Sequence, residues 1–502
     1  MRTKKAFFNT ITGMGYQITA IVCAFILPRL ILSSFGSSYN GVVSSVNQFL
    51  SWISLLSAGI GGVTRAALYK PLAEKNITKV SSIMKATDIF MKKVATIFVV
   101  ILFIFAATYP LLVHKDFKYL FVFSLILVLG INTFSQYYFG ITYQTLLEAD
   151  QRQYVYTLVR IITTLVGTIA AATLIILGFE IRIVYLVSSV IYACNPIFLN
   201  LYVKRYYHLN LEVKADNSTV KQRWDAFAQE FAIMVNSNTD IIILTVFCDV
   251  KIVSVYTVYN MIINGVKQLL QTFTTGIGAA FGNMIAQGKE NRYLDDSLKV
   301  FEFVVINVTT VLFSITAMVI VPFVKIYVRG VTDVQYTRVC FSYIITFAAM
   351  FNCYRIPYQT IVYAAGKFKE TRNGSIVEAI LNIIISVILV NVIGLNGVVI
   401  GTLIAAVFRT CQYALYLSEH LIVRSKMIFI KNIILSLVVT VFSVAVFNCL
   451  IHITVNNYFE WGVLAVIALV VVLIPMLIID IIFYYRQLLT VKTKVIKIFR
   501  KK

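Results

Sequence analysis

The stretch WGVLAVIALVVVLIPMLIIDIIFY at 461–484 contains a single charged side chain, Asp480. A helix needs about 20 consecutive, mostly apolar residues to cross the hydrocarbon core of a bilayer. The stretch therefore predicts a transmembrane helix. Asp480 lies near its end, where we expect the carboxylate at the membrane interface.

Similar apolar stretches recur along the chain, which has 502 residues, of which 59% are hydrophobic and only 13% charged. About a quarter of the residues of a soluble domain are charged, so this composition excludes a soluble globular protein. We predict an all-α polytopic membrane protein with about fourteen transmembrane helices. The predicted spans are 8–34, 39–66, 93–113, 119–141, 155–178, 181–203, 225–247, 252–281, 300–327, 338–362, 373–393, 395–418, 430–452 and 461–484.

The formal net charge of +22 has a topological explanation. Most lysines and arginines fall in alternate links between the spans, and such residues mark the cytoplasmic side. This pattern predicts that both termini are cytoplasmic and that the inner face attracts anionic membrane lipids. A nucleic-acid-binding protein would gather its positive charge on one soluble face, so no nucleic-acid partner is expected.

A weak internal repeat divides the chain. A shift of 217 residues places Tyr39 on Tyr256 and the Gly-Ile-Gly at 59–61 on that at 276–278, and a shift of 215 places Thr145 on Thr360. Both shifts carry one span onto the sixth span after it, as expected of parallel repeats in transporters. We predict two pseudo-symmetric six-helix lobes, 1–215 and 216–425, followed by two further helices and a basic cytoplasmic tail in 426–502.

Polar and charged groups inside the predicted spans are the candidate functional residues, because an ionised side chain in hydrocarbon needs a partner or a wet cavity. Asn264, Lys267 and Gln271 recur at helical spacing in one span. This stripe indicates a hydrated cavity, although polar residues also join helices by hydrogen bonds. The other candidate cations are arginines that either face the cavity or extend to the headgroups, namely Arg29, Arg65, Arg355 and Arg409.

Two embedded carboxylates, Asp240 and Glu378, are candidates for ion coupling. Burial disfavours the charged form of a carboxyl group, which suits it to proton exchange. Structural ion pairs with the arginines are the alternative. No cofactor is expected, and the cysteines show no metal-ligand spacing, so protons or sodium are the possible coupling ions.

An excess of lysine and arginine over carboxylates would suit an anion, and guanidinium groups bind phosphate through two hydrogen bonds. Neighbouring asparagine, glutamine and serine side chains would suit a ligand rich in hydroxyl groups. The residues therefore favour an amphiphile with an anionic, glycan-bearing head.

Four short motifs carry a family resemblance: FGSSYNG at 35–41, GIGG at 59–62, LYKPL at 68–72 and GLNGVVIGT at 394–402. With the fourteen-span layout, they resemble the O-antigen and capsule flippases of the multidrug/oligosaccharidyl-lipid/polysaccharide (MOP) superfamily. The resemblance implies export of an undecaprenyl-pyrophosphate-linked oligosaccharide across the bacterial cytoplasmic membrane by alternating access. It also implies that Arg29 and Arg65 match arginines of such flippases, and that a polysaccharide polymerase and chain-length machinery are partners.

Two other functions remain as alternatives. A cation-coupled multidrug antiporter of the same superfamily would use cavity acids, which here are fewer than the cations. A membrane polysaccharide polymerase or glycosyltransferase would need a large outer loop with catalytic groups, and the predicted outer links are short. We therefore expect a transporter and no enzyme.

Overall fold

The computed structural model describes residues 2–57, 60–114, 116–207, 209–210, 212–216, 239–274, 277–287, 290–451 and 453–500. In these ranges the chain is helical and contains no β-strand. A helix satisfies its backbone hydrogen bonds within one segment, which is required where no water is available. The chain divides into two compact units, Met1–Ser254 and Val255–Lys502. The predicted lobe boundaries rest on the sequence repeat and stay a prediction.

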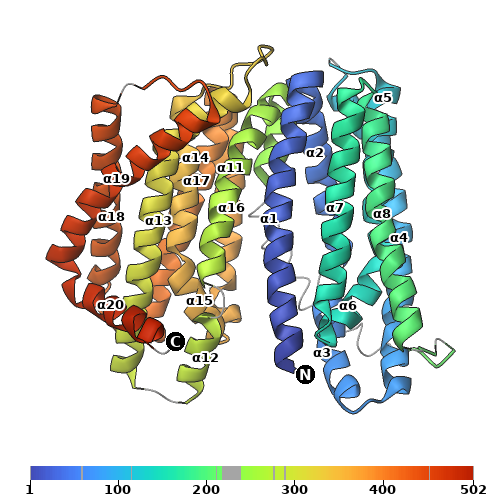
Figure 1. Cartoon of the computed structure of the whole chain (residues 1–502), viewed down its shortest axis with the longest axis horizontal. Helices are drawn as coiled ribbons and strands as arrows, with labels where there is room; N and C mark the ends of the chain where they lie inside the picture. Colours follow the sequence, from blue (N-terminus) through green and yellow to red (C-terminus); the bar gives the residue numbers. More distant parts are fainter. Residues whose placement is uncertain are drawn as a thin grey trace. The chain divides into compact units, whose positions relative to one another are not determined.

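The first unit is built from long helices that pack side by side. Helix α7 packs against both α1 and α8, and α5 packs against α4 and α8 (Figure 1). Two of the predicted spans are interrupted here, one by a 3₁₀ turn (η1) and one by a π-helical turn (η2). The elements are α1 (Arg2–Phe35), α2 (Ser37–Ile53), η1 (Ser54–Ser57), α3 (Ile60–Ala73), α4 (Ile77–Leu112), α5 (Tyr119–Ser135), η2 (Gln136–Gly140), α6 (Ile141–Ala149), α7 (Gln153–Ile176) and α8 (Ile181–Tyr207).

The second unit is organised around one long helix, α13, which packs against α14, α18 and α19. Helix α17 packs against α16 and α14. The elements are α11 (Val250–Thr274, of which the first five residues belong to the first unit), α12 (Ile277–Ala286), α13 (Asn291–Tyr327), α14 (Val339–Tyr354), α15 (Ile356–Ala364), α16 (Phe368–Ile393), α17 (Leu395–His420), α18 (Met427–Leu450), α19 (Tyr458–Phe483) and α20 (Tyr485–Arg500).

Within the described chain, 11 helices are long and apolar enough to cross a membrane. The chain is therefore an all-α multi-pass membrane protein. Three of the predicted spans are not among these helices, namely 39–66, 225–247 and 252–281. The first is divided between α2, η1 and α3, and the second lies mostly outside the described residues. The third contains α11 and α12, between which residues 275–276 lie outside the described chain.

The described helices of the two units begin and end at corresponding places. Helix α3 begins at Ile60 and α12 at Ile277, which reproduces the shift found in the sequence. Helices α6 and α15 end at Ala149 and Ala364, again at the shift found there. Helix α3 packs on α6 in the first unit, and α12 packs on α15 in the second. The internal sequence match thus coincides with a repeated order of helices and of helix contacts.

The matched glycines occupy equivalent contacts. A Cβ added to Gly61 would lie 3.9 Å from Thr145 Oγ1, and a Cβ added to Gly278 would lie 3.2 Å from Thr360 Cγ2. In each unit the glycine faces the threonine that the repeat pairs with it. These small residues let the two short helices approach closely.

The hairpin of α16 and α17 is held together by glycines. Gly394 turns the chain with a positive φ of 56°, a conformation that glycine adopts without strain. A Cβ on Gly397 would overlap the backbone of Leu389, and a Cβ on Gly401 would overlap Ser386. This close approach sets the facing positions of α16 and α17, which supply a carboxylate and an arginine to the site described next.

Candidate functional site

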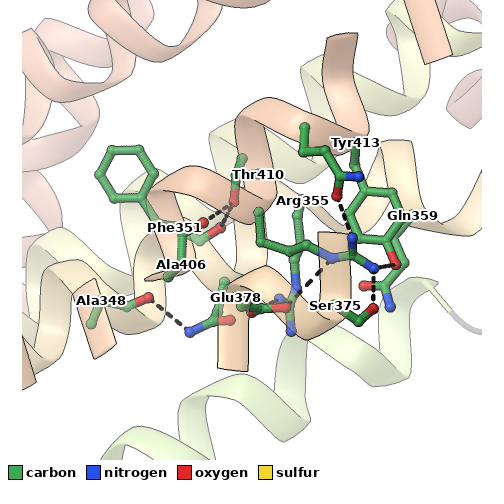
Figure 2. A network of polar contacts seen from close by, with 12 residues as sticks. Ala348, Phe351, Arg355, Gln359, Ser375, Glu378, Ala406, Thr410 and Tyr413 are labelled. Carbon is green, nitrogen blue, oxygen red and sulfur yellow. Dashed lines mark hydrogen bonds and ion pairs between the residues drawn. The ribbon is translucent and has the colours of Figure 1, made fainter. Parts of the chain in front are cut away.

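An ion-pair cluster lies within the second unit where α14, α15, α16 and α17 meet (Figure 2). Arg355 Nη1 on the break between α14 and α15 is 2.8 Å from Glu378 Oε1 on α16. Arg409 Nε on α17 is 3.4 Å from the other carboxylate oxygen of Glu378. Three of the residues predicted from the sequence therefore form one cluster, which holds two positive charges and one negative charge.

Arg409 is the buried partner, with 2% of its surface exposed. Besides Glu378, its guanidinium donates to the Thr371 carbonyl at 3.0 Å, to Ser375 Oγ at 2.5 Å, to Tyr413 Oη at 2.6 Å and to Gln412 Oε1. These contacts occupy all five guanidinium N–H groups. Arg409 therefore holds Glu378 and the α16–α17 hairpin in place and has no donor left for a ligand.

Arg355 differs from Arg409 in both exposure and hydrogen bonding. Its side chain is 23% exposed. Among the described residues, its one side-chain hydrogen bond runs from Nη1 to Glu378. A break in the helix, with Pro357 in the first turn of α15, places Arg355 at this position. Most of its donors can therefore meet an anionic ligand, and the paired carboxylate fixes the direction of the guanidinium.

Lys267 on α11 lies near this cluster. The Cys353 thiol on α14 is close enough to both Lys267 and Arg355 for their positive charges to act on it. Lys267 is partly buried, whereas Asn264 and Gln271 of the same stripe are exposed. The second unit thus brings a third cation within electrostatic range of Cys353, two residues before Arg355 in the chain.

The remaining predicted residues belong to the first unit. Arg65 on α3 is ion-paired at 2.6 Å with Glu148 on α6, whose carboxylate also accepts a hydrogen bond from Gln144 at 2.8 Å. Arg29 is partly buried in the last third of α1, and Asp240 is buried in the helical residues 239–247. Asp240 and Glu378 therefore lie in different units.

The sequence analysis missed a second buried ion pair, between Glu302 on α13 and Arg424 in the link from α17 to α18. Arg424 Nη1 is 2.7 Å from Glu302 Oε2, and Nη2 contacts the other oxygen. Burial alone would lower the pKa of Arg424, but the hydrogen bond and the charge of Glu302 raise it above its ordinary value. Asn291 and Val423 exchange two hydrogen bonds of 3.0 Å beside the pair. The available signal was a carboxylate inside the predicted span 300–327.

Among the described residues, no three histidine, cysteine or acidic side chains are grouped so as to hold a metal ion. The cluster of Arg355, Glu378 and Arg409 suits the binding of an anionic group and offers no nucleophile or acid–base pair. Glu378 is held by two arginines, so it binds no added cation while both pairs are intact.

Comparison with known proteins gives a structural relationship. No protein-family model and no curated protein matches the sequence. A multidrug resistance MATE-family transporter of the MOP superfamily in its inward-facing conformation is similar over 82% of this chain and 98% of its own, with a TM-score of 0.62 and 12% identity. The outward-facing conformation of a MATE-family transporter of that superfamily matches over 83% of this chain and 95% of its own, with a TM-score of 0.56 and 13% identity.

A MATE transporter in complex with MaL6 gives a TM-score of 0.55 over 83% of this chain and 95% of its own, at 13% identity. Identity this low shows a shared fold and leaves the substrate open. The chain therefore has the fold of the MOP-superfamily transporters, an all-α multi-pass membrane fold known in inward-facing and outward-facing conformations.

Proposed function

We propose that this protein is a flippase that moves an undecaprenyl-pyrophosphate-linked oligosaccharide from the inner to the outer leaflet by alternating access. The observation that supports this most directly is the buried cluster in which two arginines face one glutamate. Its surplus positive charge lies inside a membrane protein, where it would be costly without an anionic partner. A pyrophosphate linked to a lipid is such a partner, and it reaches the site from the membrane.

The geometry suggests how the anion and a coupling cation could be linked. A phosphate oxygen that binds Arg355 would compete with Glu378 for the same Nη1 donor. Release from Arg355 would leave Glu378 with Arg409 alone, which lowers the cost of adding a proton or a sodium ion to the carboxylate. Lys267 would supply further charge to the phosphate, and Asn264 and Gln271 would bind sugar hydroxyl groups. Asp240 is the coupling candidate of the first unit.

The remaining parts of the proposal follow from the sequence. We place the protein in the bacterial cytoplasmic membrane with both termini cytoplasmic, fourteen spans, two six-helix lobes and a C-terminal pair. Arg29 and Arg65 would bind the pyrophosphate from the first lobe. A polysaccharide polymerase and chain-length machinery would act on the exported unit, and anionic lipids would bind the basic inner face.

A cation-coupled multidrug antiporter is the second candidate, because the similar solved structures include multidrug transporters. Such a protein needs an accessible carboxylate that binds organic cations. The carboxylate of the candidate site, Glu378, is paired with two arginines. This charge arrangement favours an anionic substrate over a cationic drug.

Deletion of the gene tests the two functions against each other. In a strain without a second flippase, we expect loss of the surface polysaccharide and accumulation of the lipid-linked repeat unit on the cytoplasmic side. Complementation with Arg355→Ala should fail although the variant reaches the membrane. Glu460→Gln, which changes the first turn of α19 outside the Arg355–Glu378–Arg409 cluster, should restore export. Normal surface polysaccharide in the deletion strain, with increased sensitivity to cationic drugs, would support the antiporter instead.

A further inference from the structure

A cavity of about 180 Å³ lies among α13, α18, α19 and the start of α20, away from the Arg355–Glu378–Arg409 cluster. Its lining combines apolar side chains with a set of polar ones that no part of the proposed transport cycle uses. A single ordered water needs about 10–15 Å³ of such space, so the cavity can hold a hydrated ligand. The polar lining residues central to the inference are Asn307, Thr310, Asn432, Ser436 and Asp480.

Asp480 is the charged group of this cavity. It lies near the end of α19, is 3% exposed and is buried against α13. Its Oδ2 accepts a hydrogen bond from Asn307 Nδ2 at 2.8 Å. Among the described residues, no lysine, arginine or histidine forms an ion pair with it. A buried carboxylate without a positive partner is strongly disfavoured, so the cavity beside it needs a positive charge.

The other buried carboxylates of the second unit have such partners. Glu302 is paired with Arg424, and Glu378 with Arg355 and Arg409. Both Glu302 and Asp480 are buried and line the cavity, and of these two Asp480 is the one without an arginine or lysine ion pair in the described part of this unit. This difference indicates that the positive partner of Asp480 is a bound cation, which can exchange with solvent.

Neutral oxygen atoms surround the cavity beside Asp480. Asn307 donates its amide nitrogen to Asp480, which leaves its carbonyl oxygen as an acceptor. Asn432 Oδ1 already accepts from Tyr484 Oη at 2.7 Å and retains a second lone pair. Thr310 and Ser436 add hydroxyl groups that lie 2.5 Å apart. One carboxylate with several neutral oxygens is a donor set for a hard cation of single charge.

The charged groups at the cavity rim determine whether a monovalent or a divalent cation is favoured. Lys299 on α13 is ion-paired with Asp295 at 2.6 Å, and Glu302 is neutralised by Arg424. Lys431 on α18 lies over the Phe483 and Tyr484 rings at 4.9 and 5.3 Å. Lys431 disfavours a divalent ion, because a second positive charge in the cavity would face it without a second unpaired carboxylate.

We propose that this cavity is a monovalent-cation site in the substrate-free protein, with Asp480 as its charged ligand and Asn307, Asn432, Thr310 and Ser436 as neutral oxygen ligands. The cation is a sodium ion or a proton, both of which neutralise one carboxylate. The site is separate from Glu378 and binds its cation whether or not the proposed flippase function is correct.

Binding of radioactive sodium to the purified full-length protein in detergent tests the site without any transport substrate. We expect binding of one sodium ion that weakens at mildly acidic pH, because protons compete for Asp480, and that is lost in Asp480→Asn. Glu460→Gln removes a carboxylate from the same helix outside the cavity and should bind sodium normally. Asn307→Ala keeps the charge but removes a neutral ligand and should weaken sodium binding at least several-fold, which preserves the test if Asp480→Asn fails to fold.

If the cation bound at Asp480 is a proton and not a sodium ion, the binding experiment gives a different result. The wild-type protein would then bind no sodium, and acid titration of wild-type protein and Asp480→Asn between neutral and mildly acidic pH would differ by one proton per chain. Equal proton uptake by the two proteins, together with no sodium binding that depends on Asp480, would overturn the proposal.

Discussion

Replacement of Arg355 and Arg409 by alanine, one at a time, separates a ligand-binding arginine from a positioning one. In Arg355→Ala, Glu378 keeps its pair with Arg409, and one hydrogen bond of 2.8 Å at a partly exposed side chain is lost. We expect a stability cost below about 1.5–3 kcal/mol, the range for a hydrogen bond to a charged group. In Arg409→Ala, four further groups lose their donor, two of them buried and two partly buried, and we expect a cost of about 3–5 kcal/mol or more, as for breaking a buried pair.

The loss of pyrophosphate affinity should follow the opposite order, with a larger loss in Arg355→Ala than in Arg409→Ala. If Arg355 donates to the pyrophosphate, its loss removes about 1.5–3 kcal/mol of binding energy, which raises Kd about 10–150-fold. Thermal unfolding of the purified proteins in detergent, and binding of a lipid-linked pyrophosphate to each, measure both quantities. Arg355→Lys, which keeps the charge but not the planar donor pair, should bind with intermediate affinity.

The reasoning is refuted by either of two results. Unchanged pyrophosphate affinity in folded Arg355→Ala would remove Arg355 from the site. Unfolding of Arg409→Ala at the wild-type temperature would show that its buried hydrogen bonds do not hold the α16–α17 hairpin together.

Three further changes test the described packing and charge. Glu302→Gln should lower the unfolding temperature in detergent because it leaves buried Arg424 with only the more distant carboxylate of Asp295 at 3.8 Å, at a cost of up to about 3–5 kcal/mol. The double change with Arg424→Met should recover part of the loss, and equal loss in both would contradict the pairing. Gly397→Ala should reduce the yield of folded protein, because its Cβ would overlap the Leu389 backbone, and a wild-type yield would contradict the close helix contact. Lys267→Ala should impair polysaccharide export at normal membrane level, and normal export would remove it from the candidate residues.

The membrane fold could be predicted from the sequence because apolar length is a local property. The stretch at 461–484 became α19, and the Gly-Ile-Gly motifs at 59–61 and 276–278 marked the starts of α3 and α12. The continuous span 39–66 was wrong as a single α-helix, because the 3₁₀ turn η1 follows the end of α2 at Ile53. The continuity of 252–281 stays a prediction, because residues 275–276 lie outside the described chain. A helix break depends on neighbouring helices that satisfy the freed backbone groups, and hydropathy does not report these neighbours.

The candidate site was predicted in part. Arg355, Glu378 and Arg409 were identified one by one from their position in spans, but their pairing requires the facing of α16 and α17 across Gly397 and Gly401. Sequence alone left ion pairing and coupling as alternatives for Glu378, and the structure shows the pair.

The position of Asp480 near the end of its span could be predicted, but its burial against α13 could not. Which face of a helix is covered by another helix is a tertiary property. Glu302 was missed for a related reason, since its partner Arg424 lies outside the spans in a link.

Transport by the purified protein in liposomes tests the central claim most directly. A polyprenyl-pyrophosphate-linked oligosaccharide is placed in both leaflets, and its exposure at the outer face is followed with a membrane-impermeant enzyme that trims the glycan. The account predicts that wild-type protein makes the inner-leaflet pool accessible to the enzyme, and that Arg355→Ala, folded and reconstituted at the same level, does not. An inner pool that stays protected with wild-type protein under imposed proton and sodium gradients of either direction would contradict it.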